Sequence, residues 1–127
     1  MSRRLGVVLA AIGLCVVTAG PTFAGTHPPL VCNAPSVQQL GAPAIGTQTS
    51  YPAASAGSVV VQRIDTGTLQ VVAANPNGGW TDQITTGSGP RDKVKFLNAA
   101  GKQVTRFAAA LNKKGTQIHL RVTECHH

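Results

Sequence analysis

The clearest set of residues with recognisable chemistry in this sequence is a short run near the N-terminus. If the chain were cut before Gly25, the segment Gly25-Thr26-His27 would offer a free α-amine, two amide nitrogens and one imidazole in a single plane. Square-planar nitrogen ligation suits Cu(II) and Ni(II). The chain ends in His126-His127, but two imidazoles without a third ligand make a poor structural metal site. Copper or nickel is therefore the one candidate cofactor, and a histidine that stands at position 27 by chance is the alternative.

A second candidate is a group of basic side chains that strand alternation places on one side of a sheet. Lys93 and Lys95 fall on the solvent side of one predicted strand, and His119 and Arg121 on that of another. Lys113 and Lys114 lie in the adjoining turn. A positive face attracts anionic cell-surface polymers, nucleic acid or acidic lipid. Specific nucleic-acid recognition is not expected, because the aromatic side chains needed for stacking belong to the predicted core. The alternative is that the lysines keep the sheet soluble and protect its edges.

Catalytic activity is not expected. The chain has a formal net charge of +7, and its few acidic residues are Asp65, Asp82, Asp92 and Glu124. The run Gly87-Ser88-Gly89 lacks the spacing of a nucleophile elbow. Alternation places Asp82 on the core side between Trp80 and Ile84, where a carboxylate must find hydrogen-bond donors or lie at an edge. We therefore expect a binding or structural module with no enzymatic activity.

The N-terminal segment has the pattern of a secretory signal peptide. Ser2-Arg3-Arg4 is positive, Leu5 to Val17 is apolar, and Thr22-Phe23-Ala24 has the small-x-small pattern of a cleavage site. The apolar run is shorter than the roughly 20 residues that cross a bilayer. We expect residues 1–24 to be removed, leaving a secreted chain with no transmembrane span. An uncleaved anchor that runs to Ala24 is the alternative.

The cysteines agree with export. Removal of residues 1–24 takes away Cys15 and leaves Cys32 and Cys125, and an even number of cysteines in an exported protein indicates a disulfide. The neutral stretch from Asn33 to Gly57 is rich in Ala, Pro, Ser and Gly. We expect residues 25–57 to form an extended leader tied down by Cys32, and residues 58–127 to form the folded domain.

From Ser58 onward, short β-branched runs alternate with turn residues every eight to twelve positions, which is typical of an all-β domain. We predict an antiparallel sandwich of six or seven strands, rich in meander connections. The six clearest strands are Ser58–Ile64, Leu69–Ala74, Trp80–Thr86, Lys93–Asn98, Gln103–Leu111 and Thr116–Glu124. The predicted core consists of Val59, Val61, Leu69, Val71, Trp80, Ile84, Val94, Phe96, Phe107, Leu111, Ile118, Leu120 and Val122. Val104 is out of phase with Phe107, which predicts a β-bulge near Thr105 or Arg106.

The order of these short motifs resembles that of uncharacterised small secreted actinobacterial proteins with one β-domain behind a signal peptide. The motifs are Ala56-Gly57-Ser58-Val59-Val60-Val61, Leu69-Gln70-Val71-Val72, Gly79-Trp80, Val94-Lys95-Phe96, Phe107-Ala108-Ala109 and Ile118-His119-Leu120-Arg121-Val122. The likeness covers roughly the last 75 residues and includes no catalytic motif. Asp82 departs from the apolar alternation that usually follows the tryptophan in that class. The resemblance implies a fold and an extracellular location, and no activity.

Overall fold

The structure is a computed structural model that describes residues 29–127. The predicted signal segment and the Gly25-Thr26-His27 motif lie outside the described residues.

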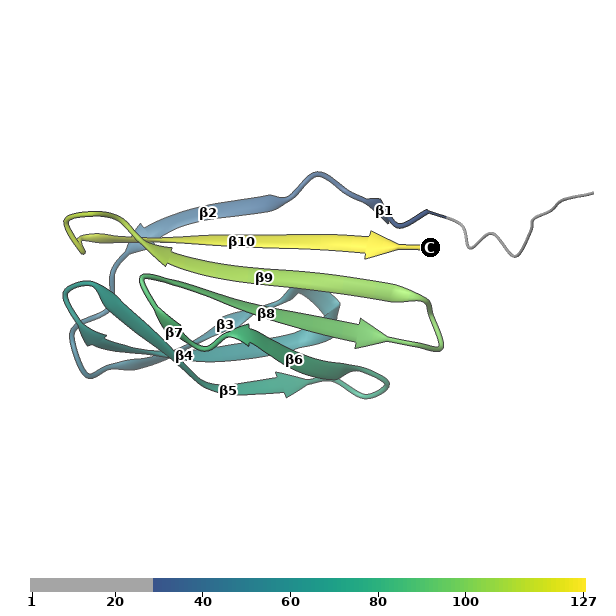
Figure 1. The fold of residues 1–127 in the computed structure, drawn as a ribbon, viewed down its shortest axis with the longest axis horizontal. Helices are drawn as coiled ribbons and strands as arrows, with labels where there is room; N and C mark the ends of the chain where they lie inside the picture. The colour runs from purple at the N-terminus through teal and green to yellow at the C-terminus, as the bar shows by residue number, and fades with distance from the viewer. Residues whose placement is uncertain (1–28) are drawn as a thin grey trace, which may run out of the picture.

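Two antiparallel sheets contain all the strands of the described chain (Figure 1). The larger sheet has the order β1-β10-β9-β8-β6, and β2 also pairs with β10. Its strands are β1 (Val31–Cys32), β2 (Ser36–Gly41), β6 (Thr81–Thr86), β8 (Arg91–Asn98), β9 (Gln103–Leu111) and β10 (Gln117–His126). The smaller sheet has the order β3-β4-β5-β7, and its strands are β3 (Gln48–Pro52), β4 (Gly57–Asp65), β5 (Thr68–Pro76) and β7 (Ser88–Gly89).

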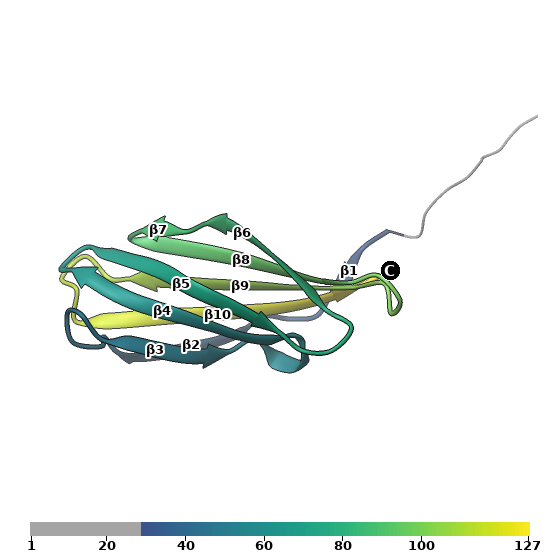
Figure 2. The same cartoon turned by 90° about the horizontal axis from the view of Figure 1, so that it is seen from below.

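The predicted all-β antiparallel sandwich is confirmed. Each of the six strands predicted from alternation corresponds to a strand of the structure, namely β4, β5, β6, β8, β9 and β10. Consecutive strands pair within β3-β4-β5 and within β8-β9-β10. The chain crosses between the sheets after β2 and after β5, and it crosses twice more around the short strand β7, which lies in the smaller sheet between β6 and β8 of the larger. Figure 2 shows the same arrangement after a quarter turn.

Strands β2 and β3 lie in the neutral stretch that the composition led us to treat as a leader. Every residue of β2 is exposed, so its sequence carries no apolar alternation. Backbone pairing with β10 holds it in the larger sheet, from Ser36 opposite Val122 to Gly41 opposite Gln117. Strand β3 pairs with β4 and inserts the buried Tyr51 into the core. The sandwich therefore draws strands from the stretch before Ser58 as well.

The core lies between the two sheets and contains most of the predicted residues. The buried apolar side chains from the prediction are Val59, Val61, Leu69, Val71, Val94, Phe96, Phe107, Ile118 and Leu120. Trp80, Leu111 and Val122 are partly buried and pack against them. Tyr51, Ala53, Ala56 and Ala109 complete the cluster.

Two details of the predicted packing are wrong. Ile84 is 46% exposed and not in the core, because β6 is the edge strand of the larger sheet. Asp82 is exposed on the same edge strand, which is one of the two places expected for it. The predicted bulge near Thr105 or Arg106 is absent, since β9 pairs without interruption with both β8 and β10. Thr105, which is 2% exposed, takes the core position in phase with Phe107.

Arg63 is a buried cation, and each of its three guanidinium nitrogens donates a hydrogen bond to a backbone oxygen. Its guanidinium donates to the carbonyl oxygens of Pro43 (3.0 Å), Asp65 (3.1 Å) and Thr66 (3.3 Å). These bonds offset the cost of removing the charge from water. Gly115 packs against this group with φ +68°, and a Cβ there would lie 2.5 Å from the Thr66 oxygen. Arg63 thus ties the loop after β2 to the β4–β5 turn.

The predicted disulfide is confirmed. Cys32 on β1 and Cys125 on β10 are directly opposite each other and bonded, with 3.9 Å between their Cα atoms. The bond ties the first described strand to the last. A disulfide is compatible with an oxidising compartment. Within residues 29–127 no helix has the length and apolar character needed to cross a bilayer.

Candidate functional site: a basic groove on the larger sheet

The basic side chains lie on the outer face of the larger sheet. In β8 the core positions are Asp92, Val94 and Phe96, so alternation turns the side chains between them outward. The strand register then fixes two rows across the sheet: Lys93, Ala108 and Arg121 stand opposite one another, as do Lys95, Arg106 and Thr123. Of the residues predicted from sequence, Lys93, Lys95, His119 and Arg121 therefore share this face.

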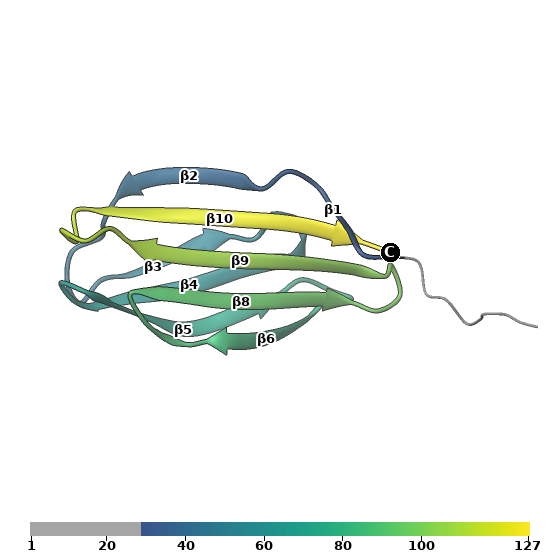
Figure 3. The same cartoon turned by 45° about the horizontal axis from the view of Figure 1, so that its top comes forward.

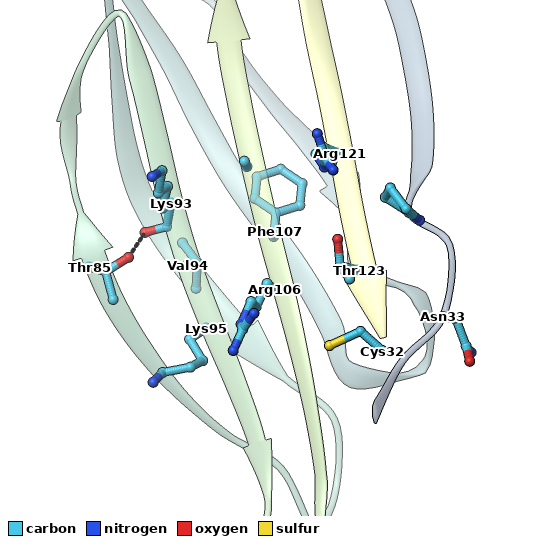
Figure 4. A pocket seen from close by; sticks show the side chains of 12 residues that line it. Cys32, Asn33, Thr85, Lys93, Val94, Lys95, Arg106, Phe107, Arg121 and Thr123 are labelled. Atoms are coloured by element: carbon cyan, nitrogen blue, oxygen red, sulfur yellow. Dashed lines mark hydrogen bonds between the residues drawn. The ribbon is translucent and has the colours of Figure 1, made fainter. Parts of the chain in front are cut away.

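The centre of this face is hollowed because the outward residues Ala108 and Ala110 of the middle strand β9 have small side chains. Ala108 lies between Lys93 and Arg121, and strand geometry puts those two cations about 10 Å apart across it. The resulting hollow has a volume of about 590 Å³. Figure 4 shows Lys93, Lys95, Arg106 and Arg121 around it, with Cys32 and Asn33 at its rim. Thr85 supports the β8 wall, since its hydroxyl donates to the Lys93 carbonyl oxygen at 3.1 Å.

A second hollow of about 610 Å³ continues the first along the strands. The two share Lys93, Ala108 and Arg121, and the second adds Ala110 to the floor. Its walls add more basic groups, Arg91, Lys113 and His119. We call the two hollows together the basic groove, and its floor is formed by Ala108 and Ala110 of β9. Arg106 and Lys113 lie before and after this floor along the chain, and the two sides carry Arg91, Lys93, Lys95, His119 and Arg121.

The groove is positive along its length, since no acidic residue lines either hollow. On β10, Glu124 lies opposite the core residue Thr105, so alternation directs it away from the groove face. The same pairing rule places Asp82 opposite Phe96 and thus off that face. Within residues 29–127 no acidic side chain pairs with a groove cation. The cations are therefore available to an external anion.

Asp92 is the one acidic residue inside the sandwich, and it lies between two groove cations along β8. Its side chain is 0% exposed, and neither carboxylate oxygen has a hydrogen-bond partner. Burial raises the pKa of Asp92 to about 7, because the ionised form loses its hydration. The buried aspartate is thus Asp92, whereas strand alternation in the sequence predicts Asp82 on the core side.

The candidate metal ligands lie partly outside the part of the chain that the structure describes. Gly25, Thr26 and His27 lie outside the described residues. His126 pairs with Val31 on one side and Gln103 on the other, and the backbone N–H of His127 donates to the Lys102 carbonyl oxygen at 3.0 Å. No cluster of three potential metal ligands exists among residues 29–127.

Sequence reasoning missed two groove residues. Arg106 was hidden by the predicted bulge, which left its direction open. Arg91 was assigned to a turn, although it is two residues before Lys93 and in phase with it. Continuing the alternation by one more step in each strand would have found both.

Comparisons with protein-family models, with curated proteins and with solved structures find no match to this chain. The functional argument consequently depends on the groove itself.

Proposed function

We propose that this protein is an exported binding module that holds an anionic polymer in the basic groove. The observation that carries the proposal is the unpaired row of cations on both sides of an alanine floor, with no acidic residue along it. A two-residue step along a strand separates successive cations by about 6.5–7 Å. Linear polymers with repeated phosphate, sulfate or carboxylate groups can meet several such cations at once, and each contact releases condensed counterions.

Among residues 29–127 every Phe, Tyr and Trp side chain is buried or packs against the core, so we propose that the polymer's charge is the recognised feature. Phe96 and Phe107 are buried under the groove, and Trp80 packs against the core. Single-stranded nucleic acid binding gains much of its energy from stacking of bases on aromatic side chains. We therefore propose a polyanion such as a cell-surface polymer, bound without base recognition.

Affinity for a model polyanion should depend on the groove and not on net charge alone. Lys93→Gln/Arg121→Gln removes the cations on either side of Ala108. We expect this variant to bind immobilised heparin about tenfold or more weakly, with a salt slope smaller by about two, because each lost contact removes roughly one released counterion. Retention is measured at several NaCl concentrations.

The matched control is Lys102→Gln/Lys114→Gln, which removes the same charge from two residues that line neither hollow. It should keep most of the wild-type affinity. Equal losses in the two variants, or wild-type retention that salt does not affect, would contradict the proposal.

Export is supported by the N-terminal signal pattern together with the Cys32–Cys125 bond, because disulfides persist in oxidising compartments. The intact mass of the native protein under non-reducing conditions is expected to match a chain that begins at Gly25 and carries one disulfide. A chain that begins at Met1 would contradict export with cleavage after Ala24.

A further inference from the structure

Strand β2 forms an outer edge of the larger sheet, since it pairs only with β10. Figure 3 shows β2 along one border of the sandwich, with β10 on its inner side and no described segment beyond it. All six of its residues are exposed, and Val37 is 61% exposed. One side of this strand thus presents backbone donors and acceptors to solvent.

The ladder with β10 shows which backbone groups face outward. The Ala42 N–H donates to the Thr116 oxygen at 3.0 Å, and the register places these two residues opposite each other. Hydrogen-bonded pairs alternate along an antiparallel ladder, so Ser36, Gln38 and Leu40 direct their backbone groups to β10. Val37, Gln39 and Gly41 direct theirs to the free edge.

This edge lacks the protection found on other edges of the sandwich. Exposed edges are normally protected by charged residues, proline, bulges or very short strands. Strand β6 has Asp82 and an irregularity between Ile84 and Thr86, β3 ends at Pro52, and β7 has two residues. Strand β2 has six residues and regular pairing, and no charged residue occurs between Cys32 and Gln62.

We propose that β2 pairs with β2 of a second copy of this chain, antiparallel and with Gln39 opposite its own copy. In that register Val37 stands opposite Gly41 of the second copy, so all three residues with outward backbone groups form hydrogen-bonded pairs. In a twofold dimer both copies use the same surface patch. One antiparallel contact therefore covers the exposed β2 edge of both copies at once. The Gln39 amide donates one hydrogen bond to Gln117 Oε1. Its other hydrogen and its oxygen can pair with Gln39 of the second copy, whereas two charged residues would repel each other there.

The pairing also keeps like charges apart. The nearest basic groove residues, His119 and Arg121, lie one strand in from the edge, opposite Gln39 and Val37. The larger sheets of the two copies become continuous, and the two β9 strands lie five strand spacings, or about 24 Å, apart. Both basic grooves then open on one face, and a longer polyanion can contact the two together. This last consequence depends on the proposed function; the dimer does not.

Sedimentation of the exported protein without any polyanion tests the dimer separately from the groove. The wild type is expected to sediment with twice the mass of one chain and to dissociate on dilution. Gln39→Lys places two cations opposite each other across the contact and should weaken the dimer by about tenfold or more. Gln39→Lys also removes the hydrogen bond from Gln39 to Gln117, but residue 39 is exposed and its backbone pairing with β10 does not depend on the side chain. Circular dichroism of the variant should therefore show the wild-type strand content.

Thr81→Lys is the matched control, since it adds the same charge to the exposed β6 edge on the opposite border of the sheet. It should leave the dimer unchanged. A wild type that stays monomeric at all concentrations tested, or equal behaviour of the two variants, overturns the proposal. An oligomer that Gln39→Lys does not weaken overturns it as well.

Discussion

Stability of the wild-type protein should fall as the pH rises from about 4 to about 7, by roughly 1.4 kcal/mol per pH unit. The cause is Asp92, whose pKa is raised by burial to about 7 from an ordinary value of 3.8. Between these values the folded protein keeps the proton and the unfolded chain releases it, so each increase in pH favours unfolding. The contribution is fully present below about pH 4 and lost above about pH 7, a total of about 4 kcal/mol.

Asp92→Asn should remove this slope. The amide has nearly the same shape and stays neutral, so the variant should match the wild type near pH 4. Above pH 7 it should be more stable by several kcal/mol, because the wild type then carries an unpaired buried charge. Urea unfolding from pH 4 to 8 measures both curves.

Asp82→Asn provides the control, since it makes the same chemical change on the exposed edge strand β6. This variant should retain the wild-type slope. A flat wild-type profile, or a slope that survives in Asp92→Asn, would show that Asp92 does not hold its proton in the folded state. The exposed Asp65 works in the opposite direction at lower pH, because the Gly67 N–H lowers the pKa of its carboxyl.

Strand alternation was sufficient to predict the strands that bury one face. Val94 and Phe96 on β8, and Ile118 and Leu120 on β10, alternate with polar residues, and each set enters the core as predicted. The same alternation placed Lys93, Lys95, His119 and Arg121 together on the other face. The basic groove was in this sense partly predictable from sequence.

Alternation could not predict strand β2, the exposure of Ile84 or the burial of Asp92. Backbone pairing, edge position and neighbouring turn residues determine these features. Strand β2 is exposed on both faces, so only its hydrogen bonds to β10 make it a strand. Ile84 has the right phase for the core, but β6 is an edge strand and its side chains remain in solvent. Asp92 has the phase of Val94 and Phe96, and it was missed because its neighbours Pro90 and Arg91 indicated a turn.

Loss of the disulfide should cost about 4–5 kcal/mol of unfolding free energy. The bond joins residues 93 positions apart and closes a ring that contains nearly the whole sandwich. In the chain-entropy model, a ring of this length stabilises the fold mainly by restricting the unfolded chain. Cys32→Ser/Cys125→Ser should therefore fold to the same structure with a much lower urea midpoint.

If the disulfide acts by restricting the unfolded chain, its loss should also change the slope of the urea titration. Without the ring, the unfolded chain is more expanded and exposes more surface, so the slope of free energy against urea should increase. Reduced and alkylated wild type should lose a similar amount of stability. A loss below about 1 kcal/mol would contradict the prediction. Heparin retention of the folded variant should stay close to wild type, because the groove cations come from β8, β9, β10 and the β9–β10 turn, while the disulfide contributes only Cys32 to the rim.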